Sequence, residues 1–238
     1  MSFILTGLLF CILSKKFSQY NEREKNTEKN LIKNHFKDLK EGLVLFKDSR
    51  IFALVLGVVF INFSSTSISA VLPAFATDEI FYSLMLAGMG GGVLLGSLLA
   101  GLPKLKDISL GNLYIYGMII VALSWFGVSY SSDNMKIAVS FYAIGWFVVG
   151  VVNVYAQTML QMIVPSNRIG SAMGAMLGIS TFMAPLGALL GGYLGEYLSS
   201  SNTVFISSFI ILLVAIYWML NENIRKLPAV NNFNKVFE

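Results

Sequence analysis

Three carboxamide side chains follow one another at four-residue intervals within a strongly apolar part of the sequence. Asn153, Gln157 and Gln161 would wind slowly down one side of a helix, because four residues turn an α-helix by about 40° beyond a full turn. Each amide can donate and accept hydrogen bonds. Such groups are costly in an apolar medium unless they face a polar interior, so the stripe predicts the wall of a water-filled pathway. Hydrogen bonding between packed helices is the structural alternative.

A second polar stripe lies in the segment INFSSTSIS. Asn62, Thr66 and Ser69 share one helical face at spacings of four and three residues, and Pro73 continues the line. We expect this stripe to line the same cavity as the first. The remaining serines of the segment are expected to form ordinary hydrogen bonds between helices: Ser64, Ser65 and Ser67.

Glycines recur in two other apolar stretches and predict close helix packing. Small residues four positions apart let two helix backbones approach each other in lipid. Pro185 lacks a backbone donor and should kink the second of these stretches. A kinked, glycine-rich helix beside a polar one suits a protein that moves, so these residues are candidates for packing and gating, together with one nearby arginine: Gly88, Gly92, Gly96, Gly174, Pro185, Gly191 and Arg168.

No arrangement of residues predicts enzymatic chemistry. The single cysteine, Cys11, and the single histidine, His35, exclude an internal disulfide and a multi-histidine or cysteine metal site. The glycines of MGGGVLLG follow no strand and lack the spacing of a dinucleotide-binding loop. No acid and base pair, or nucleophile with its base, occurs deep in an apolar stretch. We therefore expect no enzyme activity, no metal and no cofactor.

The composition places these stretches in a membrane. Of 238 residues, 55% are hydrophobic and 13% are charged, about half the charged fraction of soluble domains. The apolar runs are each about as long as the ~20 residues that cross a bilayer, and in lipid they must be helical. We therefore predict an all-α membrane protein with a six-helix transmembrane bundle over residues 50–221, whose helices cover 51–73, 80–102, 108–130, 137–163, 169–198 and 203–221.

The segments outside the bundle complete the expected organisation. Residues 1–14 are apolar but too short to span a bilayer, and their positive charges follow the apolar run, unlike those of a signal peptide. This pattern favours the end of a helix whose beginning is missing, and hence a fragment of a longer protein. Residues 15–49 form a long polar loop, and residues 222–238 form a tail.

Basic residues predict the orientation of the bundle. If residues 15–49 are cytoplasmic, sixteen of the seventeen Lys and Arg residues fall on the cytoplasmic side, and Lys136 alone falls on the other. The positive-inside rule describes this asymmetry. We therefore expect a multi-pass protein of the cell membrane with its long loop and C-terminus in the cytoplasm. Glu residues interspersed in the loop disfavour a nucleic-acid partner.

The six predicted helices form an internal repeat. The first and fourth are polar, the second and fifth are glycine-rich, and the third and sixth are the plainest. Three helices repeated with inverted topology is the architecture of each half of a major facilitator transporter.

Two segments resemble members of the major facilitator superfamily that export drugs and macrolides. FKDLKEGLVLFKDSRIFALVLGVVFINF is similar to their central loop and seventh helix, and VPSNRIGSAMGAMLGISTFMAPLGALLGGYLGEYL to the junction of their tenth and eleventh helices. The second segment carries the matching Pro165, Arg168, Gly170 and Gly174. The resemblance covers the chain from the end of helix 6 through helix 12. The loop between helices 8 and 9 departs from the family pattern, since only Gly101, Lys104, Lys106 and Asp107 remain of it.

The resemblance implies half of a secondary transporter. Such a protein exports a lipophilic or drug-like solute, as an antiporter would, and binds it in a cavity lined by helices 7 and 10. Its partners would be the lipid bilayer, the small-molecule substrate, and a missing N-terminal half or a second subunit. No ionisable residue lies deep in the six helices, so we expect no proton coupling by this chain alone. A fragment or scaffold that does not transport is the alternative.

The predicted topology can be tested with two single cysteines in a Cys11→Ser background. Cysteines at Asn30 and Ser200 should react with an impermeant thiol reagent from opposite sides of the membrane, because one lies in the basic loop and the other between the last two helices. Labelling of both positions from outside intact cells would contradict the orientation.

Overall fold

The computed structural model describes residues 47–164 and 169–232, and this part of the chain is helical without strands. Six helical spans are long and apolar enough to cross a membrane, which confirms the predicted all-α membrane architecture. They are formed by α3 (Ser49–Phe75), α4 (Glu79–Leu99), α6 (Leu110–Ser129), α7 (Met135–Ile163), the pair α8 (Ile169–Phe182) and α9 (Ala184–Leu198), and α10 (Ser200–Leu220). The expected partial helix at 1–14, nearly all of the loop at 15–49, and Arg168 lie outside the described residues.

Most spanning helices begin at a polar residue that caps the first turn. The first N–H groups of a helix have no partner within it, so a side-chain oxygen must supply one. Asp78, for example, accepts a 2.7 Å hydrogen bond from the backbone N–H of Phe81. The same role fixes the first residue of four other spans, whose caps are Asp48, Ser109, Asn134 and Ser199.

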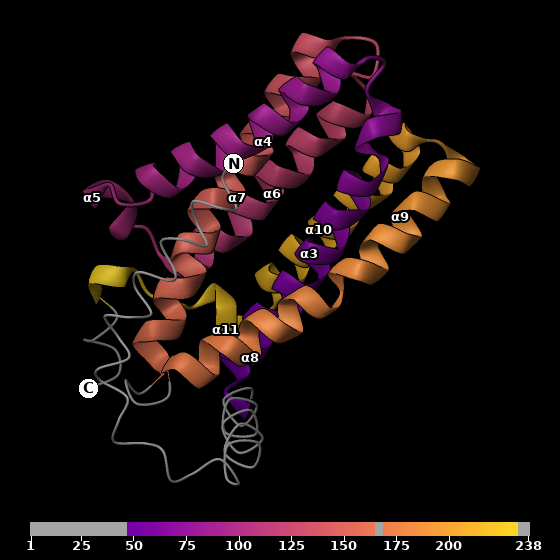
Figure 1. Cartoon of the computed structure of the whole chain (residues 1–238). Helices are drawn as coiled ribbons and strands as arrows, with labels where there is room; N and C mark the ends of the chain where they lie inside the picture. Colours follow the sequence, from indigo (N-terminus) through magenta and orange to yellow (C-terminus); the bar gives the residue numbers. More distant parts are fainter. Residues whose placement is uncertain (1–46, 165–168, 233–238) are drawn as a thin grey trace, which may run out of the picture. The chain divides into compact units, whose positions relative to one another are not determined.

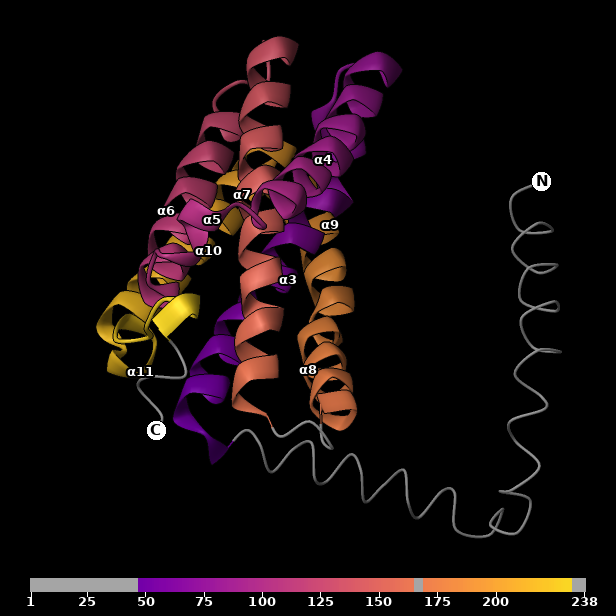
Figure 2. The same ribbon diagram turned by 90° about the vertical axis from the view of Figure 1, so that its left-hand side faces the viewer.

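The six spans pack around two of their number, α3 and α7. Helices α4 and α6 pack on α7, and helices α9 and α10 pack on α3. Contact between α6 and α10 joins the two groups. Figure 1 shows α4, α6 and α7 together at one side and α3, α9 and α10 together at the other. Figure 2 shows the bundle from the side of α4, α6 and α7.

Large aromatic side chains fill the centre of the bundle. Trp125 of α6, Tyr142 of α7, and Tyr114 and Trp218 of α6 and α10 are fully buried. The Trp218 indole N–H donates a 2.9 Å hydrogen bond to the Ala53 carbonyl of α3, which ties α10 to α3. The glycine-rich spans, α4 and α8 with α9, are the least buried of the six and lie at the flanks.

Short elements follow α4 and α10 at one end of the bundle. The four-residue helix α5 (Pro103–Lys106) follows α4, and α11 (Glu222–Arg225) with the 3-10 turn η4 (Val230–Asn232) follows α10. The backbone N–H of Leu110 donates a 3.1 Å hydrogen bond to Pro228. The first part of the predicted tail is therefore packed against the start of α6.

The contact between α4 and α7 depends on glycine. A Cβ atom added at Gly92 would lie 2.6 Å from the Ala143 carbonyl oxygen and 3.0 Å from the Phe147 nitrogen, both backbone atoms. One at Gly150 would lie 2.5 Å from the Val93 carbonyl oxygen. The two backbones touch directly, and any side chain here would force them apart.

Gly92→Ala should destabilise the bundle by about 1–3 kcal/mol, because the backbone of α7 cannot yield to the added methyl group. Gly90→Ala on the same helix is the matched control, since no atom of residues 47–164 or 169–232 lies within 4 Å of its added Cβ. Thermal unfolding of the detergent-solubilised protein would show a lower Tm for Gly92→Ala only. Equal Tm values for the two variants would contradict the close contact.

Candidate substrate pathway

The α7 carboxamides are exposed and unpartnered. Asn153, Gln157 and Gln161 all lie on the surface of the bundle, and none forms a hydrogen bond with the residues that the structure describes. Neighbouring Thr158 behaves differently, since its hydroxyl donates a 2.8 Å bond to the Val154 carbonyl of its own helix. The three amides therefore keep their full hydrogen-bonding capacity for water or a solute.

The α3 stripe is instead largely satisfied within the protein. The Thr66 hydroxyl donates to the Asn62 carbonyl at 2.7 Å, and the exposed Ser69 hydroxyl donates to the Ser65 carbonyl at 2.8 Å. These are local bonds of a helix to its own preceding turn. Asn62 is the residue of this stripe whose side-chain amide donates a hydrogen bond to another helix.

Asn62 forms a hydrogen bond at the break between α8 and α9. The α-helix stops at Phe182 and resumes at Ala184, with Pro185 in the first turn of α9. Such a break frees carbonyl groups of the preceding turn. The Asn62 side-chain amide donates a 3.0 Å hydrogen bond to one of them, the Ser180 carbonyl.

Close to the break, α3 and α9 are in backbone contact. The Ser67 hydroxyl donates a 2.8 Å hydrogen bond to the Gly187 carbonyl across the interface. A Cβ atom added at Gly191 would lie 2.5 Å from the Ser67 Cα atom. The Ser65 hydroxyl bonds within α3, and the buried Ser64 hydroxyl has no partner among the described residues.

Residues of both polar helices, α3 and α7, line a small cavity. It has a volume of about 80 Å³ and lies between α3, α6, α7 and α10, with Asn62, Ser65 and Asn153 in its wall. A cavity of this size with several polar groups has room for water molecules.

Trp146 also lines this cavity, although it was not among the residues predicted from the sequence. Its indole N–H is buried and donates no hydrogen bond to the described residues. The residue lies seven positions before Asn153, about 20° away around the helix. That spacing was a usable signal, because it puts Trp146 on the same face as the carboxamides.

The predicted packing and gating residues occupy different environments. Gly88 and Gly96 face α7, as Gly92 does, and Gly191 faces α3. A Cβ atom added at Gly174 would meet no atom of the described residues within 4 Å. The last residue of this group, Arg168, is not described.

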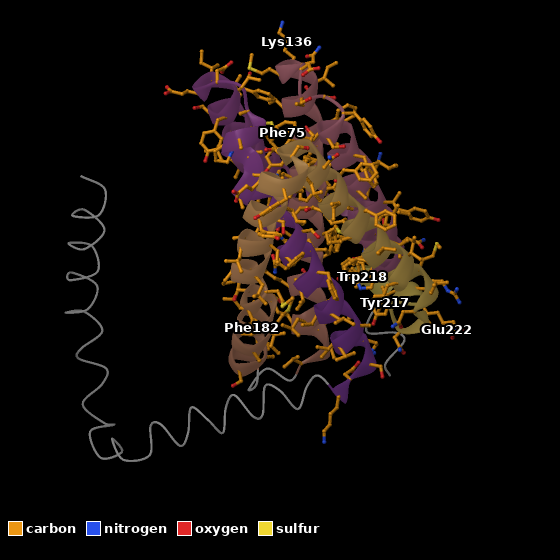
Figure 3. All side chains as sticks on the ribbon, turned by 90° about the vertical axis from the view of Figure 1, so that its right-hand side faces the viewer. Phe75, Lys136, Phe182, Tyr217, Trp218 and Glu222 are labelled. Carbon is orange, nitrogen blue, oxygen red and sulfur yellow. The ribbon has the colours of Figure 1, made fainter. Side chains whose placement is uncertain are left out.

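Charged residues of the described bundle lie at its ends. Figure 3 shows Lys136 at one end and Glu222 at the other. Near the start of α3, the Arg50 side chain donates hydrogen bonds to Asp48 and thereby lowers the pKa of that carboxyl group, against the opposing effect of its partial burial. No group of three or more possible metal ligands occurs among the described residues.

Comparison with known proteins identifies the family. The model of the transmembrane secretion effector family, part of the major facilitator superfamily, matches residues 3–236. The chain belongs to this family. No curated protein and no solved structure matches it.

Membership explains the composition of the bundle. Major facilitator proteins are multi-pass membrane transporters and are generally not enzymes. The six apolar spans are those of an MFS transporter half and lie in a lipid bilayer.

Proposed function

We propose that the chain contributes one wall of a substrate pathway in a secondary transporter that exports lipophilic or drug-like solutes. The observation that carries the proposal is the set of free carboxamides on α7. A polar side chain on a spanning helix is costly in lipid, so three of them on one exposed face require water, protein or a solute beside them. The mostly apolar helices around them suit a solute with few polar groups.

The opposite wall would come from a second helical bundle, either a further segment or a second subunit. Two features support this part of the proposal: the exposed α7 stripe, and the face of α8 at Gly174, where an added Cβ would meet none of the described residues. The α3 stripe would also line the pathway, through those side-chain atoms that form no hydrogen bond within the protein. Its residues are Asn62, Thr66 and Ser69. The change between inward-open and outward-open states would involve the break at Pro185. It would also involve the close helix contacts at four glycines: Gly88, Gly92, Gly96 and Gly191.

Equivalent contacts support a 3+3 inverted repeat, in which α3, α4 and α6 correspond to α7, the pair α8 with α9, and α10. The second helix of each unit packs by glycine on the first helix of the other: α4 on α7, and α9 on α3. The third helices also correspond. Trp125 of α6 lies against Gly145 of α7, and Trp218 of α10 lies against Gly57 of α3.

The distribution of basic residues supports an orientation in the cell membrane. Because successive spans alternate in direction, Lys104 and Lys106 share one end of the bundle with Arg225 and Lys226, and Lys136 lies at the other. We assign the more basic end to the cytoplasm.

The transport proposal can be tested with Gln157→Leu. In cells that express the protein, this variant should reduce energy-dependent export of lipophilic dyes that carry a hydrogen-bonding group by about two- to tenfold, the equivalent of one lost hydrogen bond. Its abundance in the membrane should stay unchanged, since Gln157 bonds to no described residue.

Thr158→Val is the matched control, because it removes a neighbouring polar group whose hydrogen bond stays within α7. It should leave export unchanged. Export that falls equally in both variants, or only in proportion to abundance, would contradict a role for the α7 stripe in the pathway.

A further inference from the structure

A second hollow, much larger than the polar cavity, lies near the α5 end of the bundle. Its volume is about 900 Å³, and its wall is formed by α4, α5, α6 and α7. Exposed apolar side chains form its mouth, among them Leu102, Ile108 and Ile120. Figure 1 shows α5 at the end of α4, where α4 diverges from α6 and α7. We call this hollow the α5 groove.

The groove has one polar end and one apolar end. Lys104 of α5 and Asn112 of α6 lie in the wall at the α5 end of the bundle. Farther along, the wall is made of aliphatic and aromatic side chains that include Phe147 and Val148. From Asn112 to Ile120 the groove follows α6 for about 12 Å, at 1.5 Å per residue. This is the amphipathic pattern of a site for a lipid, with a charged head and an apolar chain.

The charge of the polar end is positive. Lys104 forms no ion pair with any residue that the structure describes, and Lys106 follows it on α5. The nearest acid in sequence, Asp107, accepts a 2.7 Å hydrogen bond from the Asn231 side chain. An unpaired lysine beside an apolar groove complements a phosphate, and basic pockets between helices on the cytoplasmic side are known to bind lipid head groups.

The groove and the proposed pathway lie on opposite sides of α7. Val148 in the groove and Gln157 in the carboxamide stripe are nine residues apart, which places them about 180° apart around the helix. If the stripe faces the pathway, the groove faces away from it, toward lipid. This direction rests on the proposed function, whereas the shape and charge of the groove do not.

We infer that the α5 groove binds an anionic phospholipid of the adjacent leaflet, with its phosphate at Lys104 and one acyl chain along Phe147 and Val148. Such a lipid would brace α5 against α6 and fill the space that α4 leaves as it diverges from α6.

Photolabelling tests this inference on the full chain in phosphatidylcholine vesicles. The probes are phosphatidylglycerol and phosphatidylcholine that carry the same photoreactive group near the end of one acyl chain. Peptide mapping should show labelling of the α7 segment 147–152 by phosphatidylglycerol at about five times the level of phosphatidylcholine, as one lysine near the surface contributes about that factor.

Two variants with matched controls locate the head and the chain. Lys104→Gln should reduce the preference for phosphatidylglycerol to near unity, while Lys106→Gln, outside the groove wall, should retain most of it. Ile120→Trp should block labelling by filling the groove, whereas Leu123→Trp, exposed on the same helix but outside the groove, should not.

Several results would overturn the inference. They are equal labelling of segment 147–152 by the two lipids, equal effects of the two lysine variants, or persistence of labelling in Ile120→Trp. Labelling of other helices with none at this segment would also overturn it, because another part of the protein would then cover the groove. These readouts need no transport, so they are independent of the Gln157→Leu result.

Discussion

The arrangement of this bundle depends on a constraint that lipid imposes on the backbone. Helices satisfy their own N–H and C=O groups, so little beyond close packing and a few polar contacts can hold one helix to another. Glycine meets that need at the two main seams, where Gly92 meets the backbone of α7 and Gly191 meets the backbone of α3. These contacts fix where α4 lies along α7 and where α9 lies along α3, and therefore which parts of the two helices remain exposed.

The two polar helices use their side chains differently as a result. On α3, the short hydroxyl groups of Thr66 and Ser69 bond to the preceding turn, and the amide of Asn62 reaches the broken helix beside it. On α7, Asn153 and Gln157 follow Gly150 on the face that this glycine presents to α4, because seven residues turn a helix to within about 20° of the same direction. They are exposed and bond to no described residue. The polar side chain of Asn62 on α3 thus stabilises the break between α8 and α9. The polar side chains on α7 instead supply free hydrogen-bonding groups.

Much of the fold could be predicted from the sequence, because the length of each apolar run and the need for internal hydrogen bonds leave only helices. The contacts of individual residues could not. Glycine spacing alone does not distinguish Gly92, which touches α7, from Gly174, which has no described residue within 4 Å of an added Cβ. A polar stripe alone does not reveal that Asn62 bonds to the Ser180 carbonyl. Trp146 was overlooked because an indole counts as apolar in a membrane run, although its N–H still needs a partner.

The central claim is that the α7 carboxamide face meets water, and thiol accessibility measures this directly. In a Cys11→Ser background, single cysteines at Gln157 and Gln161 should react readily with a small charged thiol reagent in membranes, while a cysteine at the fully buried Met159 should not. A solute that occupies the pathway should slow the reaction of the cysteine that replaces Gln157. If both exposed positions are as inert as Met159 under conditions that favour either the inward- or the outward-open state, the carboxamide face lies in lipid or against protein, and α7 lines no water-filled pathway.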